Sequence, residues 1–419
     1  MMMSCMKLHR VAPALILLVA FGSSALFSQD LFIRGGRVLT GTGQDMKDTH
    51  VLVRAGRIAE VGPDLVAPSG VKTLNAYGRV VMPAYVVAHT SSGIGRSNEV
   101  APVTPFVSVL DSLDPTAAFI EDCFRDGNYT LHICPGHRTV VGGTGAIVKP
   151  YGLSVNSMAM VPDASMKLSM IPLNGNRASQ LARLRQALED GQRYLEGKRR
   201  DAESEVKTGN VALDLKALGV ERRQQSMARL LEGDLVAFVA CETAGDCLQA
   251  LKLAEEFKIK VRLVCGPGTW RAAEWLGKQG VSIILEGSFL LEETDHETGK
   301  EVVRNIPSIM KKAGVRFAVV PEPGGLGTRY MWYQAASLVR CGFSREEALA
   351  CVTTIPAEMI GLKDRKGDLS VGKDADILIL TDDPFSGLAW VDTGIVAGEV
   401  IYSRSEDPRL AEVLGNEAK

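Results

Sequence analysis

Short apolar runs separated by glycines dominate the first and last parts of the 419-residue chain. They are rich in β-branched residues, a pattern typical of β-hairpins. The runs are Leu31–Leu39, Val51–Gly62, Lys72–Leu74, Gly372–Leu380 and Val391–Tyr402. Neither end of the chain is large enough to bury a core alone. We therefore expect residues 29–80 and 362–405 to form one composite β-sandwich, followed by a tail at 406–419.

The pattern changes between these two ends of the chain. Strand-like runs such as Asp234–Ala240 and Lys260–Val264 alternate with helix-like runs such as Asp246–Phe257. Alternating β and α segments over roughly 270 residues predict a parallel sheet, and that length suits a closed (β/α)8 barrel. The predicted fold class is therefore α/β, with a TIM barrel at residues 81–361 inserted into the β-sandwich.

The N-terminus has a different composition. Lys7 and Arg10 precede an apolar run from Val11 to Phe21, and small residues follow. This order is typical of a secretory signal peptide, and the apolar run is shorter than the roughly 20 residues that span a bilayer. We expect residues 1–28 to be removed, which would leave an exported periplasmic or extracellular protein without a stable membrane anchor.

Charge and cysteine content exclude some classes of function. The formal net charge is −2 and no basic stretch is interleaved with aromatic residues, so nucleic acid is not an expected partner. Seven cysteines follow the predicted signal peptide without close spacing. This number does not indicate a disulfide framework, so buried free thiols are the default interpretation. The sequence does not determine the oligomeric state, and a homo-oligomer is one of the possible states.

Two motifs carry a resemblance to a known family. The strand-like run Arg79–Ala88 leads into His89-Thr90-Ser91, and a second motif reads Gly-Asp-Leu-Ser-Val-Gly-Lys-Asp-Ala-Asp at residues 367–376. Both resemble the amidohydrolase superfamily, particularly its imidazolonepropionase-like branch, over residues 31–403. The resemblance implies the same barrel and sandwich, hydrolysis of carbon–nitrogen bonds, and one or two divalent metal ions.

Several expected metal ligands are replaced in this chain. The resemblance implies a His-x-His pair after the first barrel strand, where His89 is followed by Ser91. It implies histidines at the ends of strands five and six, where Ala240 and Cys265 stand, and a catalytic aspartate after strand eight, near Glu322. We therefore take His89 and Cys265 as candidate metal ligands and Glu322 as the candidate catalytic carboxylate.

Three further residues are weaker candidates. Lys149 follows a glycine-rich run and is a candidate bridging lysine, although that run also fits a hairpin and lacks the Gly-Lys-Ser/Thr of a phosphate loop. His132 and His137 bracket Cys134-Pro-Gly and could complete a rebuilt site with His89.

The missing ligands determine the functional expectation. A structural zinc site is worth about 10–16 kcal/mol, or roughly 3 kcal/mol per ligand. Loss of two ligands would weaken binding by roughly four powers of ten. The first hypothesis is therefore an exported protein whose metal site is degenerate and holds no metal or a weakly bound divalent metal (zinc if any). Its hydrolytic activity is lost or strongly reduced, and it acts as a binding protein for a small amide or peptide. The alternative is an active amidohydrolase with a rebuilt mononuclear site.

Overall fold

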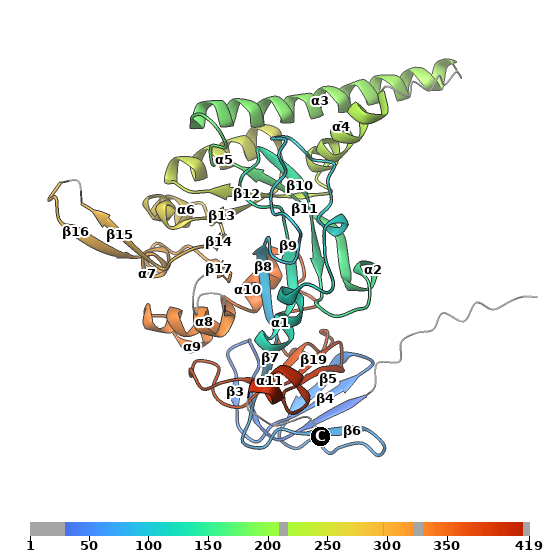
Figure 1. Ribbon diagram of the computed structural model, residues 1–419, viewed down its shortest axis with the longest axis vertical. Helices are drawn as coiled ribbons and strands as arrows, with labels where there is room; N and C mark the ends of the chain where they lie inside the picture. Colours follow the sequence, from blue (N-terminus) through green and yellow to red (C-terminus); the bar gives the residue numbers. More distant parts are fainter. Residues whose placement is uncertain (1–29, 209–216, 296, 322–329, 414–419) are drawn as a thin grey trace, which may run out of the picture.

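The computed structural model describes residues 30–208, 217–295, 297–321 and 330–413. A strand-rich unit lies at one end of the molecule, a barrel occupies the middle, and a pair of helices projects beyond the barrel (Figure 1). The predicted signal peptide, residues 1–28, lies outside the described residues.

Two sheets form the strand-rich unit, and both ends of the described chain contribute to it. The four-stranded sheet has the order β5-β4-β1-β6, and the six-stranded sheet has the order β20-β19-β18-β7-β2-β3. The strands are β1 (Leu31–Arg34), β2 (Arg37–Leu39), β3 (Asp45–Met46), β4 (His50–Arg54), β5 (Arg57–Gly62), β6 (Lys72–Asn75), β7 (Val80–Pro83), β18 (Ile377–Leu380), β19 (Val391–Val396) and β20 (Glu399–Ser403). The late strand β18 pairs antiparallel with the early strand β7, which joins the two ends of the chain.

The six-stranded sheet is buried on both faces. Side chains alternate between the two faces of a strand, so neighbours in sequence enter different cores. Val81 and Ile377 contribute to the core between the two sheets, whereas Met82 and Leu378 contribute to the barrel core. The continuous apolar sequences of β7 and β18 thus attach the sandwich to the barrel.

Eight strands form the barrel sheet, in the order β17-β14-β13-β12-β11-β10-β9-β8. They are β8 (Tyr85–Thr90), β9 (Asn128–Ile133), β10 (Val141–Val148), β11 (Ala159–Ser169), β12 (Val236–Cys241), β13 (Val261–Cys265), β14 (Ile283–Leu285) and β17 (Phe317–Val319). The two edge strands are joined through one turn. The Val319 N–H donates to the Cys351 carbonyl (3.1 Å) and the Val86 N–H to the Val352 carbonyl (3.0 Å). The predicted α/β barrel with a sandwich built from both chain ends is confirmed.

One barrel strand departs from the expected parallel pattern. β10 runs antiparallel to both β9 and β11. A parallel connection needs a crossover of a dozen or more residues, and the segment 134–140 between β9 and β10 is too short for one. The glycines of β10 allow the neighbouring chain to pack closely against it, because a Cβ atom at Gly143 would lie 2.1 Å from the Val107 carbonyl oxygen.

Helices and one hairpin complete the molecule. The α-helices are α1 (Ala118–Asp126), α2 (Val155–Met158), α3 (Arg177–Thr208), α4 (Ala217–Glu232), α5 (Ala244–Phe257), α6 (Ala273–Lys278), α7 (Ile306–Lys312), α8 (Met331–Arg340), α9 (Arg345–Ala350), α10 (Thr354–Met359) and α11 (Pro408–Val413). The 3-10 helices are η1 (Val109–Asp111), η2 (Pro267–Ala272) and η3 (Arg404–Glu406), and the hairpin is β15 (Leu290–Thr294) with β16 (Glu301–Asn305). Helices α3 and α4 pack together as the projecting pair (Figure 1). Across the described ranges, no helix combines the length and apolar character that a bilayer crossing requires.

Candidate metal centre

Three potential metal ligands meet at the C-terminal ends of the barrel strands. His89 lies near the end of β8, His137 lies in the turn after β9, and Glu286 directly follows β14. Their donor atoms lie within 4.8 Å of one another, and within the described part of the chain no other group of His, Cys, Asp and Glu side chains meets this criterion. His137 Nε2 lies 2.9 and 3.0 Å from the two Glu286 oxygens, and His89 Nδ1 lies 3.7 Å from Oε2. Active sites of this barrel architecture lie at the same end of the strands.

A lysine from the fourth strand of the barrel reaches the same cluster. Lys167 on β11 is fully buried, and its Nζ lies 3.0 Å from His89 Nε2. Strands β11 and β8 are not neighbours in the sheet, so this contact crosses the barrel interior. For His89 to offer a metal the Nδ1 lone pair that faces Glu286, its ring proton has to lie on Nε2 and be donated to a neutral Lys167 amine.

Burial and charge set the protonation states of the cluster. Burial, together with the positive charge of Lys167, holds the pKa of His89 well below its usual value. Burial also lowers the pKa of Lys167. Burial alone would raise the pKa of Glu286, but the hydrogen bond from His137 and the charges of His137 and Lys167 outweigh it, and the pKa is lowered. The site therefore combines a neutral His89 with an ionised carboxylate, as divalent-metal binding requires.

His132 lies close to this cluster but has a structural role. Its Nδ1 lies 2.8 Å from the Ala88 carbonyl and its Nε2 lies 2.8 Å from Ser165 Oγ, so both ring nitrogens are occupied. Its ring also contacts Phe238 at 4.2 Å between centroids. Burial lowers the pKa of His132 to about 4, although the Ala88 carbonyl opposes this shift. Of the two histidines that bracket Cys134, the structure brings only His137 to His89.

Cys265, the other predicted ligand, is not brought to His89. Lys167 faces the barrel interior and pairs with Phe238 on β12, so Ala240, two residues further, also faces inward. Cys241 therefore faces outward, and its register partner is Cys265. Cys265 Sγ accordingly lies 3.9 Å from Cys247 Sγ on the outer helix α5.

Three sequence candidates remain: Glu322, Ser91 and Lys149. Glu322 is outside the described residues. Ser91 directly follows β8 and is half-buried. Lys149 follows the antiparallel strand β10 and therefore lies at the opposite end of the barrel, where its ammonium is 5.6 Å from the ring centroid of Tyr151.

Sequence reasoning missed three functional candidates. Lys167 lies in the alternating run Ser165-Met-Lys-Leu-Ser169, and this period of two could have indicated a polar residue facing the barrel interior. Glu286 follows a short apolar run and gave no comparable signal. Glu242 directly follows β12, and its pKa is raised by burial and by the negative charges of Asp246 and Glu286.

Comparisons with known proteins agree with this class of barrel. A model of the Amidohydrolase family matches residues 320–402. Amidohydrolase tasK of Hapsidospora irregularis is 22% identical over 391 residues, which cover 82% of this chain and 39% of that protein. The chain thus spans about two fifths of the length of this relative.

Solved structures show the same fold. The crystal structure of an amidohydrolase from Thermotoga maritima MSB8 has a TM-score of 0.79 at 23% identity and covers 89% of this chain and 100% of that chain. A prolidase complexed with N-methylphosphonate-L-proline has a TM-score of 0.51 at 14% identity and covers 90% of this chain and 100% of that chain. The fold, the sequence relative and the family match are all of the amidohydrolase type, and the chain is similar to these proteins in each of the three comparisons.

Proposed function

We propose that this protein hydrolyses a carbon–nitrogen bond in a small amide or dipeptide at a mononuclear metal centre formed by His89, His137 and Glu286. The observation that supports this proposal is the convergence of these three side chains within 4.8 Å at the mouth of the barrel. Superfamily members usually bind a metal, and the prolidase fold neighbour supports a substrate of dipeptide type.

The residues present fit a divalent cation. Two imidazoles and one carboxylate form a donor set that suits zinc and leaves a coordination position open. His137 Nδ1 is buried and has no hydrogen-bond partner within the described structure, so one nitrogen donor of the cluster is not used by the protein itself. A divalent cation held there would polarise the scissile carbonyl and lower the pKa of a bound water to about 7.

Three side chains have separate roles in positioning, metal binding and proton transfer. Lys167 fixes the ring orientation of His89 through its contact with Nε2. Glu286 is ionised and belongs to the ligand set. Glu242 directly follows β12 on the same rim of the barrel, and we assign proton transfer to this carboxyl, which stands outside the ligand set. Its pKa is raised while that of Glu286 is lowered, and such opposite shifts are typical of acid–base pairs.

A second candidate function is binding without turnover. It is favoured by Ala240, which faces the interior where related hydrolases are expected to carry a histidine, and its register partner Val264 is a second apolar side chain there. Export of a mature chain through the N-terminal segment also belongs to this proposal, and N-terminal sequencing of the protein secreted from its native host would test it.

The experiment combines metal analysis with a substrate screen. The purified protein is equilibrated with zinc, passed through a desalting column and analysed for bound metal, and it is then assayed on N-acyl amino acids and proline-containing dipeptides. We expect one zinc per chain and hydrolysis that ceases when the metal is removed. One zinc without any hydrolysis would support the binding function, and absence of zinc would contradict both the metal centre and the proposed hydrolysis.

A further inference from the structure

A second cavity lies at the opposite end of the barrel from the metal centre. It is enclosed by the start of β8, helix α1, the N-terminus of α8, the sandwich strands β18–β20 and helix α11, and its volume is about 360 Å³. Tyr85 lines it, whereas His89 is four residues further along the same strand, or about 13 Å in an extended strand. The cavity is therefore separate from the candidate metal centre.

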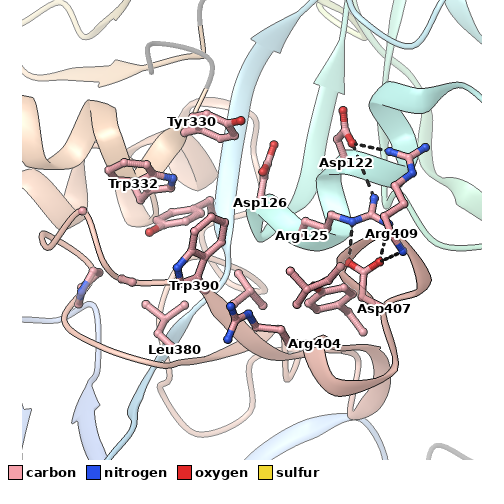
Figure 2. A pocket seen from close by; sticks show the side chains of 17 residues that line it. Asp122, Arg125, Asp126, Tyr330, Trp332, Leu380, Trp390, Arg404, Asp407 and Arg409 are labelled. Carbon is pink, nitrogen blue, oxygen red and sulfur yellow. Dashed lines mark hydrogen bonds and ion pairs between the residues drawn. The ribbon is translucent and has the colours of Figure 1, made fainter. Parts of the chain in front are cut away.

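Aromatic rings form one side of this cavity (Figure 2). Tyr330 and Trp332 stack with ring centroids 5.8 Å apart and planes inclined by 23°. Trp390, which extends from the loop between β18 and β19, is 59% exposed. A large aromatic side chain exposed beside a concave, mostly apolar surface is typical of a small-molecule site.

Ion pairs form the other side, and these charges satisfy one another. Arg125 donates to both oxygens of Asp407 (2.7 and 3.0 Å), and the Tyr402 hydroxyl donates to the same carboxylate (3.0 Å). Arg409 pairs with Asp122 at 3.3 Å, as Figure 2 also shows. The ion pairs therefore fix the shape of this side of the cavity, and they leave few hydrogen-bond donors free for a polyhydroxylated ligand such as a sugar.

Arg404 is the exception among the cationic side chains of the cavity. Its guanidinium carbon lies 5.5 Å from the ring centroid of Trp390, and it forms no ion pair with any residue of the described ranges. A guanidinium that stacks on an aromatic ring keeps its in-plane N–H groups available to a carboxylate. In Figure 2, Arg404 and Asp126 lie on two different sides of Trp390.

From these contacts we propose that the cavity binds a small aromatic carboxylate. The ring of the ligand lies among Trp332, Trp390 and Tyr330, and its carboxylate pairs with Arg404. The volume fits a one- or two-ring compound, since ligand sites begin at about 300 Å³. This inference does not depend on the proposed hydrolysis, because none of the lining residues belongs to the metal centre.

Isothermal titration with three matched probes tests the proposal. Indole-3-acetate carries both the ring and the charge, indole-3-ethanol lacks the charge, and cyclohexylacetate lacks the aromatic ring. We expect indole-3-acetate to bind with a Kd below about 1 mM and each of the other two probes to bind at least tenfold more weakly.

Variants then locate the binding site. We expect Arg404→Gln and Trp390→Leu each to weaken indole-3-acetate binding at least tenfold without a change in melting temperature, because both side chains are partly or largely exposed. Arg271→Gln is the matched control, since Arg271 also stacks on a tryptophan (4.6 Å from the Trp270 centroid) but lies outside the cavity. Glu286→Ala should bind indole-3-acetate with unchanged affinity, which excludes the metal centre as the binding site.

Four results would overturn the proposal. The first three are absence of binding to the unmodified protein, equal affinity for the charged and uncharged indoles, and unchanged affinity in both Arg404→Gln and Trp390→Leu. Loss of binding in Glu286→Ala would also overturn it by moving the ligand to the barrel mouth.

Discussion

The replacement Glu286→Gln tests the metal centre most directly. The substitution removes the only carboxylate of the three-residue cluster. The glutamine side-chain oxygen can still accept a hydrogen bond from His137 Nε2, which lies 2.9 Å from Glu286 Oε1 in the native site. The side chain at this position is 30% exposed, so we expect the fold to persist and the melting temperature to change by no more than a few degrees.

The magnitude follows from the number of ligands. A structural zinc site contributes about 10–16 kcal/mol through four ligands, or about 3 kcal/mol for each. Loss of one anionic ligand should therefore weaken zinc binding by about 100-fold, since 1.4 kcal/mol corresponds to a factor of ten. The affinity is measured by competition with a chromogenic chelator, and hydrolysis is measured on the substrates that the screen identifies.

Two variants make this measurement specific. Glu274→Gln is the control, because Glu274 is an exposed glutamate on α6. Glu242→Gln should leave zinc affinity unchanged but lower kcat by 100-fold or more, since a general acid–base residue contributes about 10²–10⁴. If Glu286→Gln binds zinc as tightly as the unmodified protein, the assignment of the metal centre is refuted. Equal losses of zinc in Glu242→Gln and Glu286→Gln would refute the division of roles.

Three other predictions concern neighbouring parts of the fold. Cys265→Ser should retain native zinc affinity because Cys265 faces α5; a loss as large as that of a ligand would place it in the centre after all. Asp407→Asn should lower the unfolding free energy by about 2 kcal/mol at pH 7, since Asp407 accepts charged hydrogen bonds from Arg125. The Arg125 hydrogen bond lowers the pKa of Asp407 in the folded protein. The contribution of ionised Asp407 to the unfolding free energy is therefore complete above the ordinary pKa of 3.8 and is lost as the pH falls below that value. Thermal melts in which Asp407→Asn and the unmodified protein differ by the same amount at pH 7 and at pH 3 would contradict this. Gly277→Ala should destabilise the protein, because its Cβ would lie 1.8 Å from the backbone carbonyl oxygen that follows α7, whereas Gly197→Ala on α3 meets nothing within 4 Å and should stabilise by up to about 1 kcal/mol in the same denaturant titration.

Much of the architecture could be predicted from local pattern. The alternation of strand-like and helix-like runs indicated the barrel, and the glycine-punctuated runs at both ends indicated the composite sandwich, because periodicity reports which side chains are buried. The antiparallel strand β10 departs from the predicted parallel sheet. The hairpin interpretation of its glycine-rich run is confirmed, because β10 pairs antiparallel with β9 across a short turn.

The candidate site, like the fold, could be predicted only in part from the sequence. The sequence by itself singled out His89. The outward orientation of Cys265 follows only from its pairing with Cys241 in the sheet.

The tertiary structure alone decided which donors meet. His89, His137 and Glu286 are separated by 48 and 149 residues along the chain, and no local spacing connects them. They converge because β8, β9 and β14 run parallel and end on one rim of the barrel, where Lys167 reaches them from across the interior. Closure of the barrel is a long-range property of many packed side chains, and it brings together residues that the sequence leaves far apart.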